Sequence, residues 1–262
     1  MPSFIVHSVA GEELSKRLKF DKKTHNKFFV ANLLPDTVQL DRDPNWSPEE
    51  LRKAIQKEKH VSHFRTDFET ILSYPDLDYF LSEYEDLVKN DIVAFGYFFH
   101  LFTDNYYFTT FLPKMITFLC EDQETIAKVK PENKFNKINK TGKVMAKVDF
   151  WNKHNEDGIY GEYNRLNKYI IDKYKFKYDV DLYRNILNDN FNVPIKEIKV
   201  DGIDNLLEEL NNFYKKSIDS DVEEFRIFEG VQVDNLIKDV VDKFLKDYDY
   251  LIRKWFLWNV LR

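Results

Sequence analysis

The sequence predicts an all-α fold, built as a single multi-helix domain over residues 1–262. Apolar residues recur with a period close to 3.6 through most of the chain, as in helices with one buried face. Glycine and proline are scarce, with seven and eight in the whole chain, whereas strands joined by tight turns normally need more of both. The 43% hydrophobic and 32% charged residues are typical of a globular protein.

Helix start signals are clearest in the first half. Ser47-Pro48-Glu49-Glu50 combines a capping serine, a proline suited to the first helical position and a glutamate that reaches back to the cap. Pro75-Asp76 opens another helix, and the almost wholly apolar run 92–102 predicts a buried one. We expect helices over about 7–18, 24–33, 48–59, 75–87, 92–104 and 113–119.

The middle of the chain differs from both ends. Residues 128–143 are rich in lysine and asparagine and contain Pro131 and Gly142, which favours an exposed loop. We therefore expect residues 121–145 to connect a half that carries the functional residues, 1–120, to a helical packing half, 146–262. In the latter we expect helices over about 160–174, 181–191, 203–218 and 231–258, the last long enough to bend, and a short unpaired strand over 196–200 is an option.

Bulk features restrict the class of protein. Cys120 is the only cysteine, so no internal disulfide can form, and a reducing compartment fits. The first residues lack the basic start and apolar core of a signal peptide, and no apolar run reaches the length of a membrane span. The net charge of −6 does not favour nucleic acid as a partner, although a net charge does not exclude a local basic groove. We expect a cytoplasmic protein.

His100 and Asp104 are four residues apart in Phe99-His100-Leu101-Phe102-Thr103-Asp104, so on a helix both project from one face. An imidazole and a carboxylate that converge provide half of a metal site. A carboxylate at the end of a buried helix needs a positive partner, and a cation would meet that need. The other interpretation is a core histidine bonded to a backbone carbonyl, with Asp104 at the solvated end of the helix.

Three further candidate ligands lie at the ends of predicted helices. His7 starts the first helix, Asp36 follows Leu33-Leu34-Pro35 after the second, and His63 follows the third. Proline directs the chain out of helical geometry, which can expose Asp36 at a helix mouth. Each residue also has an ordinary explanation: His7 as a cap or surface residue, Asp36 as a turn aspartate, and His63 as a turn residue.

These residues together predict a metal centre between helices of the N-terminal half, with His7, Asp36, His63, His100 and Asp104 as ligands. Nitrogen and oxygen donors suit zinc, and other first-row divalent ions fit as well. Five side chains exceed one tetrahedral site with an open position. We therefore expect one or two zinc ions, with Asp104 as the bridge if there are two.

Four blocks occur in order within the first 105 residues: Phe4-Ile5-Val6-His7, Asn32-Leu33-Leu34-Pro35-Asp36, Ser62-His63-Phe64 and Gly96-Tyr97-Phe98-Phe99-His100-Leu101-Phe102-Thr103-Asp104. In this order they resemble the zinc-dependent phospholipase C family, whose superfamily also contains single-strand nucleases. The resemblance implies an all-helical hydrolase that uses a cluster of metal ions, usually zinc, to cleave phosphodiesters. The second half of the chain has no matching motif.

The resemblance also implies a division of ligands, in which His7 and Asp104 hold one ion and the other three candidates share its neighbour with Asp104. The best-known members use the N-terminal amine of the mature chain as a further ligand, but here Met1 lies six residues before His7. They also place a further histidine about two turns after the aspartate, whereas here Phe108 stands eight residues after His100, and Thr109 and Thr110 follow. Late ligands for a third ion would come from His154 with Glu156, Asp157 or Glu162, unless His154 is simply a loop residue.

We therefore expect a metal-dependent hydrolase that cleaves a phosphoester, above all a phosphodiester, by attack of water bound to the metal. Asp36 is either a ligand or the group that orients and deprotonates the water. Arg65 either contacts the phosphate through two donors or is an exposed arginine in a polar turn. A phospholipid is one candidate substrate, with Trp255-Phe256-Leu257-Trp258 as either a membrane contact or a core-facing helix end.

Two alternatives stay open. The same scaffold could serve a nuclease or a phosphomonoesterase, and a non-catalytic helical module could hold one structural ion in a closed site. Other hydrolase signatures do not occur in the chain, which has no His-Asp dipeptide, no Gly-x-Ser-x-Gly elbow and no Gly-x-x-x-x-Gly-Lys loop.

Overall fold

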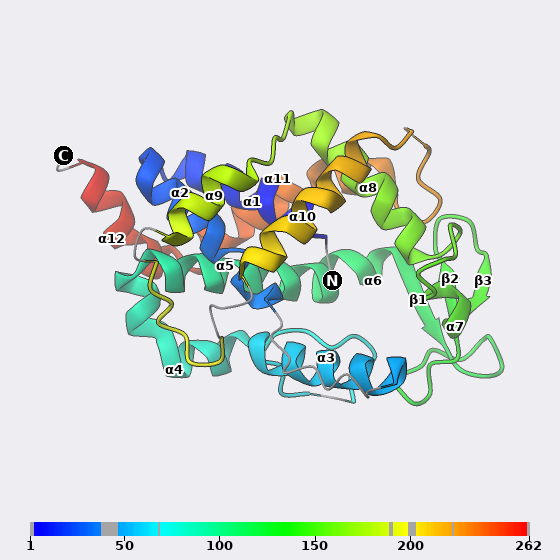
Figure 1. The fold of residues 1–262 in the computed structure, drawn as a ribbon. Coiled ribbons are helices and arrows are strands. Elements are labelled where there is room, and N and C mark those ends of the chain that lie inside the picture. The colour runs from blue at the N-terminus through cyan, green and yellow to red at the C-terminus, as the bar shows by residue number, and fades with distance from the viewer. Residues whose placement is uncertain are drawn as a thin grey trace.

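The computed structural model describes residues 3–37, 47–67, 69–188, 191–198, 203–221 and 223–260. These residues are mostly helical, which confirms the all-α prediction, with one small sheet added (Figure 1). The elements of the first half are α1 (Phe4–Arg17), α2 (Lys22–Ala31), η1 (Leu34–Asp36), α3 (Pro48–Ser62), α4 (Leu77–Asn90), α5 (Ile92–Tyr106), the π-helix η2 (Tyr107–Phe111) and α6 (Leu112–Met115). They are followed by β1 (Ile116–Leu119), β2 (Phe135–Ile138), β3 (Val144–Ala146), α7 (Lys147–Phe150), α8 (Ile159–Tyr174), α9 (Val180–Asn188), α10 (Ile203–Ile218), α11 (Gly230–Asp247) and α12 (Asp249–Val260).

Helix α5 is the centre of the fold and packs against α1, α2, α4 and α11. Almost all of its side chains are buried, as its apolar sequence predicts. Gly96 allows α2 to approach closely, because a Cβ atom there would lie 2.7 Å from the Cβ of Ala31 and 2.7 Å from the carbonyl oxygen of Phe28. This contact fixes the end of α2 one helical turn away from His100.

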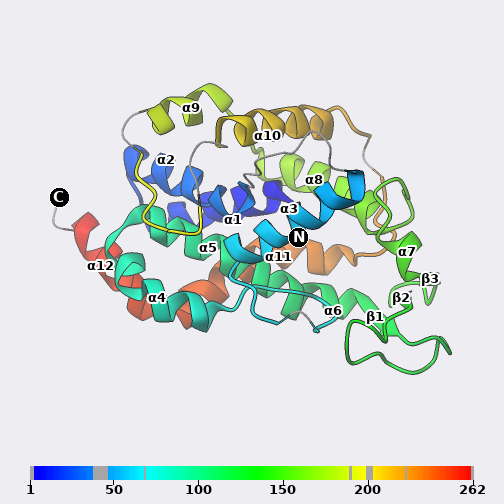
Figure 2. The same cartoon turned by 60° about the horizontal axis from the view of Figure 1, so that its bottom comes forward.

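The second half of the chain packs around α1 and α5. Helices α8 and α11 contact α1, α10 contacts α8, and α12 contacts α4 (Figures 1 and 2). The long helix expected over 231–258 is two helices, α11 and α12, which are separated at Tyr248. Trp255 packs against Phe20 and Phe95, so this residue of the C-terminal aromatic run faces the core.

The antiparallel sheet β1–β2–β3 corrects two expectations. The helix expected over 113–119 ends at Met115, and the β-branched and aromatic residues Ile116–Leu119 form β1 instead. The connection expected over 121–145 contains β2 and most of β3. These strands were missed because they are three or four residues long and their polar residues hide the alternation of buried and exposed positions. Of the strand considered over 196–200, residues 196 and 197 form a turn and the last two lie outside the described residues.

The sheet lies at one end of the molecule and α12 at the other (Figures 1 and 2). Among the helices that the structure describes, none has both the length and the apolar character needed to cross a lipid bilayer.

Candidate metal centre

The five predicted ligands converge on one buried point from four elements. His7 lies in the first turn of α1, Asp36 ends η1, His63 follows α3 as its C-cap, and α5 supplies His100 and Asp104. Two sets of donor atoms each lie within 4.8 Å of one another: those of His7, Asp36 and His100, and those of His63, His100 and Asp104. The sequence therefore identified residues that meet in space.

The separations between donor atoms are those expected around a shared ion. Nε2 of His7 lies 3.3 Å from Oδ1 of Asp104, while Nε2 of His63 lies 3.5 Å from Oδ2 of Asp104 and 3.7 Å from Oδ1 of Asp36. Donors held at 2.0–2.2 Å from a tetrahedral zinc ion are about 3.3–3.6 Å apart. Asp104 turns one oxygen toward each of two histidines, which is the geometry of a bridging carboxylate.

Hydrogen bonds to the outer ring nitrogens orient two of the histidines. Nδ1 of His100 donates to the carbonyl oxygen of Asn32 at 2.8 Å, which leaves Nε2 to face the centre. The hydroxyl of Ser62 donates to the carbonyl of Pro35 at 2.8 Å and lies 3.0 Å from Nδ1 of His63. Because the single hydroxyl proton goes to Pro35, Nδ1 of His63 is the donor to Ser62. Both rings are therefore held in the tautomer that a metal ligand requires.

The inner atoms of this cluster lack the partners that buried polar atoms normally have. Nε2 of His63, Nε2 of His100 and Oδ2 of Asp104 make no hydrogen bond to any described residue, and all three side chains are fully buried. A lone pair on His63 that faces two carboxylates is unfavourable unless a cation lies between them. The residues present thus fit a bound metal ion, and this confirms the coarse prediction that buried histidine and aspartate groups could hold one.

The electrostatics of the cluster favour neutral rings at His63 and His100 beside ionised carboxylates. Burial lowers the pKa of His63 well below its ordinary value, and burial together with the neighbouring His7 ring lowers the pKa of His100 to about 4. Burial alone would raise the pKa of Asp36, but the charge of Lys59 and the nearby histidines outweigh it and lower that pKa. The same balance, with His7 as the main partner, lowers the pKa of Asp104.

Two cations border the cluster. Nζ of Lys59 lies 3.1 Å from Oδ1 of Asp36, and Nη2 of Arg65 lies 3.5 Å from Oδ2 of Asp104. The side chains of Asp36, Lys59 and Arg65 keep 15%, 27% and 11% of their exposure, whereas the other ligands are fully buried. Solvent therefore reaches the cluster on the side of these three residues. The interpretation of Arg65 as an exposed arginine in a polar turn is therefore wrong, because its side chain is only 11% exposed.

A pair of tyrosines lies beyond Asp104. Tyr107 belongs to the π-helix that follows α5 and Tyr163 to α8, with 6.2 Å between their ring centroids. Both phenols are within electrostatic reach of Asp104, and burial raises the pKa of each, so they remain protonated at neutral pH. Phe108, eight residues after His100, is buried and packs edge-on against Tyr107.

The late ligands considered for a third ion do not join the cluster. His154 lies exposed in a turn, where its backbone N–H donates to the side chain of Asn152. Glu162 is fully buried, but its carboxylate accepts hydrogen bonds from the backbone N–H groups of Arg226, Ile227 and Phe228. Asp157 pairs with Lys143 and Arg226, and Glu156 is exposed. Glu162 and Asp157 thus have structural partners, and His154 and Glu156 lie exposed.

Sequence reasoning missed the residues that support the ligands. Lys59 could have been found, because it precedes His63 by one helical turn on α3. Asn32 and Ser62 act through a backbone carbonyl and a hydroxyl, and neither residue type signals such a role by itself. Tyr97 donates a hydrogen bond to the carbonyl of Ser62. The sequence does not distinguish it from an ordinary core tyrosine in an apolar helix.

In comparisons with known proteins, no family model, no curated protein and no solved structure matches the chain.

Proposed function

We propose that this protein is a metal-dependent hydrolase of phosphoesters, with phosphodiesters as the favoured substrates and zinc as the favoured metal. One observation carries the proposal. Among the residues that the structure describes, five nitrogen and oxygen donors converge on one point, and two cationic side chains border the side of this point that is partly exposed. Donors of this kind suit zinc, and cations beside the centre suit a negatively charged substrate.

The chain would divide the work as follows. His7, His63, His100 and Asp104 hold the metal, with Asp104 shared if there are two ions. A zinc ion, when bound, lowers the pKa of a coordinated water to about 7 and polarises phosphoryl oxygens. Arg65 lies 3.5 Å from Oδ2 of Asp104 and keeps 11% of its exposure, so its guanidinium could bind a phosphoryl oxygen and stabilise negative charge in the transition state.

Asp36 is the ligand best placed for a second role. It is the only one of the five with an exposed part, and Lys59 keeps its carboxylate ionised through the contact at 3.1 Å. A carboxylate at the open side of the centre can accept a proton from an attacking water or orient that water. Lys59, once a substrate binds, is positioned to contact both Asp36 and a phosphoryl oxygen.

A structural ion is the one alternative that an observation favours, because four of the five ligands are fully buried, and closed sites are usually structural. The two functions differ in a simple measurement. A structural ion predicts a large loss of thermal stability on chelation and no hydrolysis of any phosphoester. The catalytic proposal predicts hydrolysis that stops on chelation and returns with zinc. The nuclease and phosphomonoesterase alternatives differ from the main proposal only in their substrate, so the same hydrolysis assay tests them.

The test combines elemental analysis of the purified protein with hydrolysis of bis(p-nitrophenyl) phosphate and p-nitrophenyl phosphate. We expect bound zinc or a related ion, and faster hydrolysis of the diester than of the monoester. Arg65→Gln should keep its metal and lose about tenfold to hundredfold in kcat/KM, as expected when a hydrogen bond to a charged group is removed. Arg253→Gln, an exposed arginine on α12, is the matched control.

Two results would contradict the proposal. One is purified protein without any transition metal that gains no phosphodiesterase activity when zinc is supplied. The other is an Arg65→Gln variant with unchanged kcat/KM on every phosphoester that the wild type hydrolyses. A variant that loses both metal and activity would show that Arg65 supports the ligands instead of the substrate, and metal content is therefore measured on the same samples.

A further inference from the structure

Residues 128–153 carry a charge opposite to that of the whole chain. This segment has eight lysines and two acidic residues, whereas the chain has a net charge of −6. It covers β2, β3, α7 and the turns between them, at one end of the molecule (Figure 1). A strongly basic surface on an acidic protein indicates an anionic partner.

The register of the sheet shows which side chains share its outer face. In β2, Asn136 and Ile138 are buried and Lys137 between them is exposed, so Lys137 points to the opposite side. Val144 is the cross-strand partner of Lys137 and therefore lies on the same face. Ala146 is two residues further along β3 and lies there too. We call this surface, with Lys137, Val144 and Ala146, the outer face.

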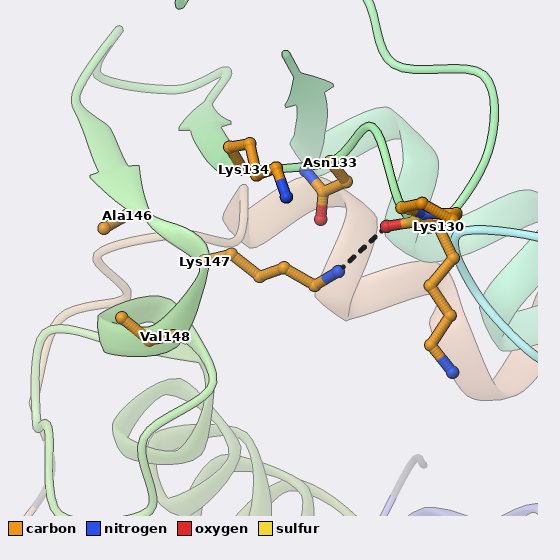
Figure 3. Close-up of a pocket in the computed structure, with 7 residues that line it drawn as sticks. Lys130, Asn133, Lys134, Ala146, Lys147 and Val148 are labelled. Carbon is orange, nitrogen blue, oxygen red and sulfur yellow. Dashed lines mark hydrogen bonds between the residues drawn. The ribbon is translucent and has the colours of Figure 1, made fainter. Parts of the chain in front are cut away.

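A pocket of about 300 Å³ adjoins the outer face at Ala146. Figure 3 shows the side chain of Lys147 reaching the carbonyl oxygen of Lys130, with Lys134 and Asn133 beside it. Asn133 is only 2% exposed, and its nitrogen donates to the carbonyl of Phe135 at 2.8 Å, while its oxygen has no partner among the described residues. The pocket is thus lined by the ammonium groups of Lys134 and Lys147, which suit the anionic oxygens of a phosphate group.

Three lysines around the pocket and the outer face have no acidic partner among the described residues, whereas Lys143 nearby pairs with Asp157. Among the described residues, no carboxylate lies within ion-pair distance of Lys134, Lys137 or Lys147. Lys147 is half-buried and donates to the carbonyl of Lys130 at 3.1 Å. Burial and the charges of Lys130 and Lys134 lower the pKa of Lys147, so the cluster repels itself, and an anion placed between its members would relieve that repulsion.

Exposed aliphatic side chains accompany the lysines. Val148 at the pocket is 77% exposed, Val144 on the outer face 36%, and Ile126 in the preceding loop 63%. No aromatic side chain is exposed among residues 116–153. Surfaces that bind single-stranded nucleic acid rely on aromatic faces for stacking, whereas an anionic bilayer takes up both lysines and aliphatic side chains at its interface. The composition of this surface therefore favours a membrane.

We infer that the outer face of the β1–β3 sheet docks on membranes that contain anionic phospholipids, with a headgroup phosphate in the pocket between Lys134 and Lys147. The lysines supply the attraction to the charged surface, and Val144 and Val148 enter the headgroup region. This surface is separate from the metal ligands, so the inference does not rest on the proposed function. If both hold, the docking brings the metal centre to a surface made of phosphodiesters.

The test is co-sedimentation of the full-length protein with vesicles of phosphatidylcholine, with or without phosphatidylglycerol. We expect binding only to the anionic vesicles, and weaker binding at high salt. Each lysine near an anionic surface contributes about fivefold to the partition coefficient, so the triple variant Lys134→Gln, Lys137→Gln, Lys147→Gln should bind about a hundredfold more weakly. Val148→Ser should weaken binding by a smaller factor at unchanged charge.

The matched control removes the same charge elsewhere, with Lys57→Gln, Lys215→Gln and Lys216→Gln on the exposed sides of α3 and α10. An equal loss of vesicle binding in both triple variants would overturn the inference, since binding would then depend on the net charge of the protein and not on this surface. Equal binding to neutral vesicles, or tighter binding of a single-stranded RNA oligonucleotide that displaces the vesicles, would also overturn it. If the triple variant fails to fold, Lys134→Gln alone replaces it, since the Lys134 side chain makes no hydrogen bond to any residue that the structure describes.

Discussion

The imidazole rings of His7 and His100 lie parallel, with 3.8 Å between their centroids and 5° between their planes. They come from helices α1 and α5, which are distant in sequence, and both rings are fully buried. Two charged imidazolium rings at this distance would repel each other strongly, and burial and this neighbour together lower the pKa of His100 to about 4. His100 is therefore neutral at pH 7, and its inner nitrogen keeps a lone pair that can bind a cation, which is the condition of a metal ligand.

Replacing His100 by alanine should therefore remove the metal. We expect the affinity for zinc to fall by at least about a hundredfold, since this imidazole belongs to both sets of converging donors. Elemental analysis after gel filtration measures the metal content. His154→Ala, which removes an exposed histidine, should keep the metal content of the wild type. A His100→Ala variant that keeps its metal would show that the ion binds elsewhere in the protein.

The stability of the metal-free protein should depend on pH in a defined direction. The pKa values of His63 and His100 are lower in the folded protein than the ordinary value of 6.5, so the unfolded chain binds more protons below pH 6.5. The free energy of unfolding is therefore fully retained above pH 6.5 and falls as the pH drops toward 4. Asp36 and Asp104, whose pKa values lie below 3.8, extend the loss to lower pH.

Urea titrations of chelator-treated protein between pH 7 and pH 4 measure this slope. Since each tenfold change in proton affinity corresponds to about 1.4 kcal/mol, His100 alone should account for a few kcal/mol. His100→Gln should flatten the slope over this range, whereas His154→Gln should leave it unchanged. A wild-type free energy of unfolding that stays constant or rises as the pH drops from 7 to 4 would refute neutral, buried histidines.

The ligands could be predicted from the sequence because each one stands at a local signal. His100 and Asp104 share a helical face within an apolar run, and Asp36 follows a proline that ends a helix. The position of Arg65 could not be predicted in this way. The backbone of Phe64 adopts a left-handed conformation, with φ of 50°, and its ring packs 4.8 Å from that of Phe80. That tertiary contact turns the chain so that Arg65 faces Asp104.

The sheet escaped prediction for a different reason. Its strands bury only alternate residues, such as Asn136 and Ile138 in β2, and asparagine does not resemble a core residue in sequence. Of the lysines that made this segment look like a loop, Lys137 occupies an exposed position of β2, and the others lie outside the three strands. Their number was visible in the sequence, but their arrangement around one pocket depends on the pairing of β2 with β3.

Ser62 provides a test of how the ligands are oriented. Its hydroxyl accepts a hydrogen bond from Nδ1 of His63 and donates one to the carbonyl oxygen of Pro35, so Ser62→Ala should free the ring to rotate or change tautomer. We expect zinc affinity to fall by about tenfold to hundredfold, as for other residues that hydrogen-bond to a metal ligand. Competition with a chelator of known affinity measures this. Ser82→Ala, an exposed serine on α4, should have no effect, and equal affinities for all three proteins would contradict the role of Ser62.

Gly96 links the packing of the fold to the metal centre. An alanine Cβ at this position would lie 2.7 Å from both the Cβ of Ala31 and the carbonyl oxygen of Phe28, and backbone at such a distance must move. We expect Gly96→Ala to lower the free energy of unfolding by about 1–3 kcal/mol, the usual cost of overpacking a core. The displacement of α2 would also carry away the Asn32 carbonyl that orients His100, so zinc affinity should fall with stability.

Gly230→Ala is the control for this substitution, since a Cβ there meets no atom within 4 Å and alanine favours the helix that begins at this residue. Its stability should equal or exceed that of the wild type. Urea denaturation and chelator competition on the same preparations separate the two effects of Gly96→Ala. A variant that is destabilised but binds zinc as tightly as the wild type would show that the contact between α2 and α5 supports the fold alone, and the orientation of His100 would then depend on its other neighbours.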